Sequence, residues 1–323
     1  MPSTPDRLHV PSARVHTWRG AAGLTLAAGD LQATFLPELG LLGVSLRHGG
    51  DELLALPGGL AAYRRGDVTG LPLLAPWANR LAGRRYRFDG TAVDLEGVAL
   101  PTDGNGLPIH GTMTAHGGWR LAGVQAEPRA AWLRATFDYG AWPQLLAAFP
   151  FPHELTVDAR VEHARLTVTT VLRATGARRV PVSFGWHPYL RVPGAPRRDW
   201  RLHLPEREHL LLDGRGLPTG TAKPEAAEHR PVGGRTFDDL YALGRDRRLA
   251  LEGAGRRVVV DLAEGYGYAQ VFAPPGKGFV CLEPMTAPVN GLGSGQCPVV
   301  RAGERFEARF SIAVEPGGGD QGT

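Results

Sequence analysis

Two titratable residues of this sequence each follow a short apolar run and each precede a proline. Glu283 lies in Cys-Leu-Glu-Pro-Met-Thr-Ala-Pro, and His187 lies in Phe-Gly-Trp-His-Pro-Tyr-Leu. Because proline has no N–H for a sheet ladder, we expect one strand to end at Pro284 and another at Pro188. Each strand would then present an ionisable side chain at its exit, among apolar neighbours.

Proton transfer is the chemistry that such a pair could perform. A carboxylate beside apolar residues is either a structural hydrogen-bond acceptor or a group with a raised pKa that exchanges protons. An imidazole titrates near neutrality and can donate a proton at working pH. We interpret Glu283 as a general base and His187 as a general acid, although the His187 motif alone equally suits a core histidine bonded to a carbonyl.

The stretch Pro-Trp-Ala-Asn-Arg offers groups that suit a sugar. Trp77 supplies a flat apolar face, and Asn79 and Arg80 supply donors, which match the apolar faces and hydroxyl-bearing edges of a pyranose. His110 follows a loop rich in glycine and proline, and such loops hold functional side chains on a rigid scaffold. The alternatives are a structural ion pair for Arg80 and a local hydrogen bond for His110.

Further candidates are a carboxylate and two amides. In Phe-Asp-Asp-Leu-Tyr we prefer Asp238 over Asp239 as an acceptor for substrate hydroxyls, although paired acids also favour the start of a short helix over residues 238–242. Gln270 is a weaker binding candidate, because a glutamine on an alternating strand commonly faces solvent. Asn290 is a candidate for an amide that fixes a loop.

No metal site and no cofactor are expected. His110 and His116 are close in sequence, but no neighbouring residues complete a zinc-ligand spacing. Cys281 and Cys297 supply neither a zinc quartet nor a disulfide framework, and a reducing, cytoplasmic location is a simpler interpretation than a bridge between them. The N-terminal stretch lacks the apolar core of a signal peptide, and no apolar run approaches the length of a membrane span.

The composition is that of a globular protein rather than a disordered chain. Of the 323 residues, 43% are hydrophobic and 21% are charged, and the net charge is only +4. The arginines are scattered among acidic residues and form no basic stripe interleaved with aromatic residues. We therefore expect neither a nucleic-acid partner nor a membrane partner.

The elements that must position the candidate residues are strands. Residues 155–161 and 166–172 alternate between apolar and polar on either side of a turn, and predict a long hairpin. Asp89-Gly90 predicts a second, tight hairpin. Further strands are predicted over residues 256–262, 268–272, 279–282 and 306–314.

Helical periodicity is poor, because glycine and proline recur along the chain. The best helix candidates are residues 142–148 and 238–242. We predict an all-β fold, a large single-domain β-sandwich over residues 1–323 with few short helices. Flexible tails are expected over about residues 1–12 and 316–323.

Six motifs in order resemble those of the aldose 1-epimerase (galactose mutarotase) family. They are Pro-Trp-Ala-Asn-Arg, Ile-His-Gly, Phe-Pro-Phe-Pro-His-Glu-Leu, Gly-Trp-His-Pro-Tyr, Phe-Asp-Asp-Leu-Tyr and Leu-Glu-Pro-Met-Thr-Ala-Pro. Each motif is weak alone, but the ordered set is specific and covers nearly the whole chain. The resemblance implies a supersandwich that binds a sugar across its concave face.

The resemblance also implies roles for matching residues. His187 falls at the position of the family's general acid, and Glu283 falls at the position of its general base. The residues that fall at or near positions holding the sugar are Arg80, His110, Asp238 (with Asp239 as the alternative) and Gln270.

The implied reaction interconverts the α and β anomers of a free hexose such as glucose or galactose. Glu283 would remove the proton of the C1 hydroxyl while a protonated His187 donates to the ring oxygen, and the opened ring would close again after rotation about C1–C2. The carboxylate would favour a charged imidazole beside it. Two alternatives stay open: a sugar-phosphate mutarotase, and a sugar-binding regulatory protein without turnover. None of these needs a metal or a redox cofactor.

Overall fold

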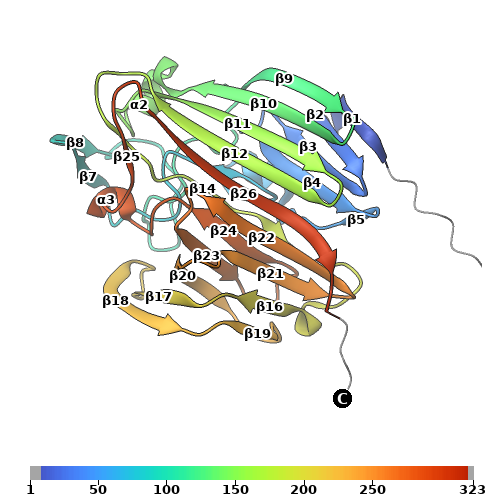
Figure 1. The fold of residues 1–323 in the computed structure, drawn as a ribbon. Helices are drawn as coiled ribbons and strands as arrows, with labels where there is room; N and C mark the ends of the chain where they lie inside the picture. Colours follow the sequence, from blue (N-terminus) through green and yellow to red (C-terminus); the bar gives the residue numbers. More distant parts are fainter. Residues whose placement is uncertain (1–8, 319–323) are drawn as a thin grey trace, which may run out of the picture.

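The computed structural model describes residues 9–318, which form mainly antiparallel β-strands in three large sheets (Figure 1). The N-terminal strands build a five-stranded sheet in sequential order. Its strands are β1 (His9–Trp18), β2 (Ala21–Gly29), β3 (Leu31–Leu36), β4 (Leu42–His48) and β5 (Asp51–Glu52).

The longest strands belong to a nine-stranded sheet. Its order is β19-β16-β21-β22-β26-β12-β11-β10-β9, so that β26, from the end of the chain, joins the β9–β12 half to the β16–β22 half (Figure 1). The strands are β9 (Arg120–Glu127), β10 (Ala130–Asp138), β11 (His153–Glu162), β12 (Arg165–Ala174), β16 (Arg201–Leu204), β19 (Glu228–Pro231), β21 (Arg248–Gly253), β22 (Arg256–Glu264) and β26 (Arg305–Pro316).

An eight-stranded sheet carries three of the candidate residues, Asp238, Gln270 and Glu283. Its order is β18-β17-β20-β23-β24-β14-β6, and β15 pairs with β24 beside β14. The strands are β6 (Leu73–Leu74), β14 (Gly185–Trp186), β15 (Tyr189–Leu190), β17 (Arg207–Leu212), β18 (Pro218–Glu225), β20 (Phe237–Leu243), β23 (Tyr268–Ala273) and β24 (Val280–Met285).

The remaining elements are small. Two further strand pairs and short helices connect the sheets. They are β7 (Arg85–Phe88) with β8 (Thr91–Asp94), β13 (Val180–Pro181) with β25 (Val299–Val300), α1 (Gly59–Arg64), α2 (Pro143–Leu146), α3 (Gly291–Ser294), and the 3₁₀ turns η1 (Tyr139–Ala141) and η2 (Arg197–Asp199).

Both predicted hairpins are confirmed. Strands β11 and β12 pair over their full length, and the residues of β11 alternate strictly between buried and half-buried, as the sequence pattern requires. Strands β7 and β8 meet at Asp89 and Gly90, whose φ angles are 48° and 75°. Positive φ at both central positions is the requirement of a tight two-residue turn, and Asp-Gly meets it at little cost.

The helix predicted over residues 238–242 is wrong. This segment lies inside strand β20, which is paired on one side with β17 and on the other with β23. Pairing along both edges and burial of Leu240 and Tyr241 outweigh the weak local preference of two adjacent acids for a helix start. The other predicted helix is present but shorter, as α2.

The expected strand end at Pro284 is also wrong, because β24 continues to Met285 and Pro284 pairs with Ala269 of β23. The opposite edge of β24 explains why the proline is tolerated. On that edge Cys281 pairs with Tyr189 of β15, and Met285 pairs with Gly185 of β14. In the described structure, the residues of β24 between Cys281 and Met285 form no ladder pair on that edge. A missing N–H is harmless where no ladder bond is made.

The core confirms the predicted all-β sandwich. One continuous hydrophobic cluster takes residues from all three large sheets, for example Leu24 of β2, Val157 of β11 and Val271 of β23. Strands β2 and β3 contact β10, β11 and β12, so the five-stranded sheet packs against one half of the nine-stranded sheet (Figure 1). The sheets therefore form a rigid base for side chains on their outer faces.

The chain ends differ in part from the expected tails. Residues 9–12 already belong to β1 and Pro316 still belongs to β26, while residues 1–8 and 319–323 lie outside the described residues. Within residues 9–318, no helix is both long and apolar enough to cross a bilayer. The single-domain organisation stays a prediction.

Candidate active site

A cavity of about 150 Å³ lies at the eight-stranded sheet, where strands β20, β23 and β24 meet the loops around residues 79 and 110. It brings together seven of the eight site residues expected from the sequence. Its lining residues are Val68, Asn79, Arg80, Ile109, His110, His187, Tyr189, Asp238, Gln270, Phe272 and Glu283.

His187 and Glu283 are in direct contact: Nε2 of His187 lies 3.2 Å from Oε1 of Glu283. The strand register explains this contact. Gly185 pairs with Met285, and Tyr189 pairs with Cys281, so the same register continued across the unpaired gap places His187 opposite Glu283. Directly opposed residues of an antiparallel pair have Cβ atoms roughly 4.5–5.5 Å apart, which allows their side chains to meet.

Burial sets the ionisation of this pair. The side chains of His187 and Glu283 are 5% and 1% exposed. Burial lowers the pKa of His187 well below 6.5, with a further contribution from His110. Burial also raises the pKa of Glu283 well above 4.5, and the negative charge of Asp238 adds to this shift. The expectation of a charged imidazole stabilised by the carboxylate is therefore not supported, because desolvation of the buried pair disfavours both charged forms.

Unpartnered polar atoms surround the cavity. Glu283 Oε2, His187 Nδ1, His110 Nδ1 and Gln270 Oε1 are buried and have no hydrogen-bond partner in the described structure. Buried polar atoms normally have a partner, so a group of four around one cavity indicates a polar ligand or ordered water. Together they offer both donors and acceptors, which suits a molecule rich in hydroxyl groups.

Three acceptors hold the guanidinium of Arg80. Its Nε donates to Oδ2 of Asp103 over 2.7 Å, its Nη1 donates to Oδ1 of Asn79 over 3.1 Å, and its Nη2 donates to Oδ2 of Asp238 over 3.1 Å. The Arg80 side chain is 15% exposed and that of Asp103 is 7% exposed, so their bond is largely shielded from solvent, whereas the side chain of Asp238 is 43% exposed. Arg80 therefore forms the ion pairs that the structural alternative implies, and it also lines the cavity.

Asp238, rather than Asp239, lies at the cavity. Its Oδ1 accepts a hydrogen bond from Nε2 of Gln270 over 2.7 Å, while its Oδ2 accepts from Arg80. Asp239 instead lies 3.4 Å from Nε2 of His209 and does not line the cavity. Gln270 is buried between β20 and β24 in the register Leu240–Gln270–Glu283, so it does not face solvent as an isolated strand glutamine commonly does.

Asn79 and His110 enter the cavity from loops with unusual backbone geometry. Their φ angles are 56° and 63°, and the backbone N–H of His110 donates to the carbonyl of Asn79 over 3.0 Å. Asn and His tolerate this left-handed region better than most residues, but it still costs energy that surrounding contacts must offset. The ring of His110 meets that of His187 edge-on at 5.6 Å, and burial with the nearby Arg80 charge lowers the pKa of His110 to about 3.

Trp77 does not line the cavity. Its side chain is fully buried in the main core cluster, so the structure does not support the predicted sugar contact. The Pro-Trp-Ala-Asn-Arg motif therefore divides into a core residue and two site residues. Asn290 has the predicted loop-fixing role, because its Oδ1 accepts from the N–H of Ala82 and its N–H donates to the carbonyl of Arg80.

Sequence reasoning missed part of the apolar wall. Phe272 and Val68 line the cavity, and the ring of Tyr189 stacks on that of His187 with centroids 4.6 Å apart. Phe272 could have been found, because it follows Gln270 by two positions on one strand and so shares its face. Val68 lies in a loop, and nothing in the sequence marked it.

Three residues could hold a metal ion. Ligand atoms of His187, Cys281 and Glu283 lie within 4.8 Å of one another, and all three residues are buried. This set was not foreseen, because the sequence places its members far apart. His116, the histidine considered for a metal in the sequence, lies elsewhere and accepts a hydrogen bond from the N–H of Gly118.

Comparison with known proteins links this site to a family. A family model described as aldose 1-epimerase matches residues 28–313, a range that contains every residue lining the cavity. Among curated proteins, the chain is 23% identical over 284 residues to the uncharacterised protein YihR of Escherichia coli K12. The alignment covers 84% of this chain and 86% of YihR.

Solved structures share the fold. A galactose mutarotase-like protein from Clostridium acetobutylicum has a TM-score of 0.85 at 20% identity, with 95% of this chain and 99% of that chain covered. A galactose 1-epimerase from Lactobacillus acidophilus NCFM has a TM-score of 0.76 at 14% identity, with 96% and 99% covered. At these identities the likeness establishes the architecture.

Proposed function

This chain belongs to the aldose 1-epimerase family, and from that premise we propose that it interconverts the α and β anomers of a free aldose. The single observation that carries the proposal is the buried contact between Nε2 of His187 and Oε1 of Glu283 at a cavity ringed by unpartnered polar atoms. A binding protein needs donors and acceptors, but it needs no acid–base couple in contact.

The proposed reaction moves two protons and breaks one carbon–oxygen bond. Glu283 takes the proton of the C1 hydroxyl, His187 gives a proton to the ring oxygen, and the C1–O bond of the ring opens to leave an aldehyde. Rotation about C1–C2 then presents the other face of the carbonyl. On closure the ring hydroxyl returns its proton to His187, and Glu283 returns its proton to the C1 oxygen, so atoms and charges balance.

The burial of the pair is compatible with this cycle. Neutral Glu283 with neutral His187, and carboxylate with imidazolium, contain the same number of protons. They differ only by transfer of one proton across the 3.2 Å contact. The reactive form therefore needs no proton from solvent, and sugar hydroxyls that bind the unpartnered atoms would stabilise its charges.

The other cavity residues would hold the sugar. Arg80 and Asp238 present a fixed charged pair, Gln270 and His110 each offer an unpartnered atom, and Asn79 positions the loop. The rings of Tyr189 and Phe272 supply an apolar wall for the faces of a pyranose. A neutral His110, with its low pKa, would act as a hydrogen-bonding group rather than as a cation.

Polarimetry tests this proposal. Freshly dissolved α-glucose and α-galactose should reach their equilibrium rotation faster with the protein than with buffer, and glucose 6-phosphate in the same assay separates a sugar from a sugar-phosphate mutarotase. Binding of these sugars without any acceleration would contradict the proposal and favour a sugar-binding protein.

A further inference from the structure

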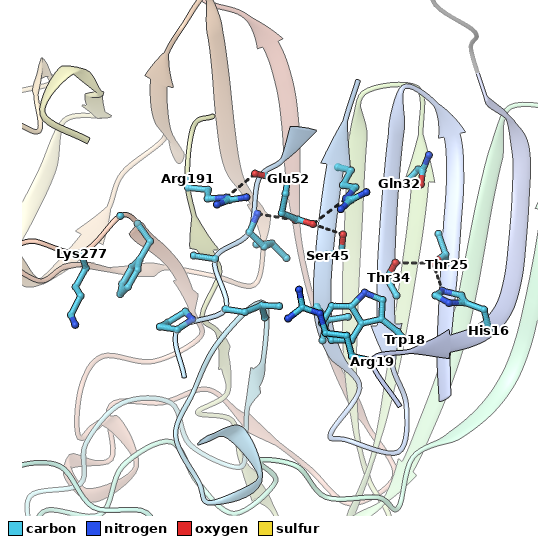
Figure 2. Close-up of a pocket in the computed structure, with 18 residues that line it drawn as sticks. His16, Trp18, Arg19, Thr25, Gln32, Thr34, Ser45, Glu52, Arg191 and Lys277 are labelled. Atoms are coloured by element: carbon cyan, nitrogen blue, oxygen red, sulfur yellow. Dashed lines mark hydrogen bonds and ion pairs between the residues drawn. The ribbon is translucent and has the colours of Figure 1, made fainter. Parts of the chain in front are cut away.

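A trough of about 820 Å³ lies beside the active-site region and has no part in the proposed acid–base chemistry. It lies between the five-stranded sheet and the segments around residues 54–57 and 277–279 (Figure 2). The sheet contributes side chains at alternating positions, the polar His16 and the aromatic Trp18 of β1 and the polar Ser45 and Arg47 of β4. The opposite face of this sheet packs in the core, so the floor of the trough is the sheet's polar face.

Positive charge dominates the trough. Four cationic side chains line it, against the single carboxylate of Glu52. They are Arg19, Arg47, Arg191 and Lys277. Within residues 9–318, Arg19, Arg191 and Lys277 form no ion pair, and the guanidinium of Arg19 lies over the ring of Trp18 at 4.8 Å. Arg19 and Lys277 therefore remain available to an anion, while Nε of Arg191 donates to the backbone carbonyl of Glu52 over 2.9 Å.

The carboxylate of Glu52 pairs with Arg47 and offsets only one of the four positive charges. It accepts hydrogen bonds from the hydroxyl of Ser45 (Figure 2), from the backbone N–H of Leu46 and of Leu54, and from Nε of Arg47. Glu52 is therefore a structural acceptor that fixes β4 to the chain after β5. The charge that remains in the trough is positive and faces solvent.

The trough adjoins the active-site cavity through one small apolar cluster. Phe279 lines the trough and packs on Tyr189 with ring centroids 4.9 Å apart, and Tyr189 in turn stacks on His187. The same cluster includes Ala55 of the trough and Phe272 of the cavity. A ligand that crosses the edge of this cluster would pass from one site to the other.

We propose that the trough binds the anionic end of an acidic oligosaccharide whose reducing sugar occupies the cavity. The inference rests on the proposed function and names the substrate class of that site. The cavity of about 150 Å³ holds little more than one sugar ring, whereas the trough of about 820 Å³ offers cations for a carboxylate or sulfate. The trough would therefore strengthen the binding of substrates that have a neutral reducing sugar at one end and a negative charge at the other.

Two matched sugars test this inference. Lactose and 3′-sialyllactose share a reducing glucose, but only the second carries a carboxylate at its far end. We expect exchange NMR of the anomeric protons to give a higher kcat/KM for 3′-sialyllactose. Added salt should reduce this advantage, since exposed charges are screened. Equal kcat/KM for both sugars at low salt would overturn the inference while leaving the proposed function intact.

Variants locate the effect. Arg19→Gln and Lys277→Gln should each raise KM for 3′-sialyllactose about threefold to fivefold, the size expected for one exposed charge, and leave KM for lactose unchanged. Lys223→Gln is the matched control, because Lys223 is the other lysine of the chain and is exposed on β18 outside the trough.

Two outcomes reject the inference in distinguishable ways. If the double variant Arg19→Gln/Lys277→Gln retains wild-type KM for 3′-sialyllactose, the trough is not the binding site, although anomeric exchange continues. If no sugar exchanges faster than in buffer, the proposed function fails and the inference fails with it. Unchanged lactose kinetics in the variants shows that their fold is intact.

Discussion

Nε2 of His187 lies 3.2 Å from Oε1 of Glu283, at positions that the register of β24 with β14 and β15 places directly opposite each other. Both groups are buried, and burial moves their pKa values in opposite directions. The pair therefore retains one transferable proton over a wide range of pH. The first two predictions follow from this state.

Glu283→Gln should lower kcat by about 10²–10⁴-fold, because an amide cannot accept the proton of the C1 hydroxyl. Sugar binding, measured by calorimetry, should remain within a few-fold of wild type, since glutamine keeps the shape and the polar contacts. His187→Asn should cause a comparable loss, and the double variant should lose little more than either single one, because the two residues act as a unit. Near-full activity of Glu283→Gln would reject the base assignment.

The pH profile of kcat/KM should have its acid limb below pH 6.5. The active pair carries one exchangeable proton. A second proton is added only below the pKa of His187, which burial lowers from 6.5, and the first is lost only above the pKa of Glu283, which burial raises from 4.5. Activity should thus stay level as pH falls through 6.5. An acid limb at or above pH 6.5 would show that His187 is solvated instead.

Glu283→Gln should also stabilise the fold at neutral pH. Below pH 4.5 the carboxyl is protonated in both the folded and unfolded states, so its raised pKa does not change the free energy of unfolding. Above pH 4.5 the unfolded state ionises while the folded state keeps its proton, and wild-type stability falls until pH reaches the raised folded pKa. The variant's advantage in free energy of unfolding should therefore grow from pH 4 to pH 7, by about 1.4 kcal/mol for each unit of pKa shift, and thermal unfolding at each pH should show it as a growing gain in Tm. A difference in Tm between the variant and wild type that stays constant from pH 4 to pH 7 would contradict this prediction.

Asp238→Asn and Asp239→Asn form a matched pair on one strand. Asp238 accepts hydrogen bonds from Arg80 and Gln270 at the cavity, whereas Asp239 contacts His209 outside it. Loss of a charged acceptor for Arg80 should raise KM about 10- to 100-fold in Asp238→Asn. Asp239→Asn should leave KM near wild type. Steady-state kinetics of the two variants at one pH decides the assignment.

Trp77→Phe should spare catalysis. The side chain is buried in the core and does not line the cavity, so kcat and KM should stay within about twofold of wild type. The smaller ring leaves a void, and we expect a loss of about 1–3 kcal/mol in the free energy of unfolding. Denaturant unfolding and steady-state kinetics together check this. A large rise in KM without a loss of stability would restore the predicted sugar contact.

The sequence predicted the strands well where side-chain period and turn chemistry agree. The β11–β12 hairpin and the Asp89-Gly90 turn follow from local patterns that need no tertiary information. The helix prediction for residues 238–242 was wrong because it rested on a local pattern that favours a helix start, whereas pairing with β17 and β23 makes the segment a strand. The strand end expected at Pro284 was wrong, because the energetic cost of a proline in a strand depends on whether the neighbouring strand pairs with it at that point. The sequence alone does not show this pairing.

The site could be predicted in its members but not in its connections. His187, Glu283 and Arg80 were marked by their motifs. That Asp103 holds Arg80, or that Gln270 bonds Asp238, depends on which loops and strands the fold brings together. Trp77 was misplaced because an aromatic residue beside a polar motif suits a sugar contact and a core position equally. Only the packing of the sheets distinguishes them.

The gap in the ladder between Cys281 and Met285 has a consequence for evolution and design. Pro188 and Pro284 have no amide hydrogen that could form a ladder bond across this gap. The imidazole and the carboxyl therefore meet without competition from main-chain donors. Their separation is fixed by how two strands align, rather than by a lid that folds over a ligand. A single-residue insertion in either strand would turn one partner to the far side of the sheet and separate the pair, however well the protein folded.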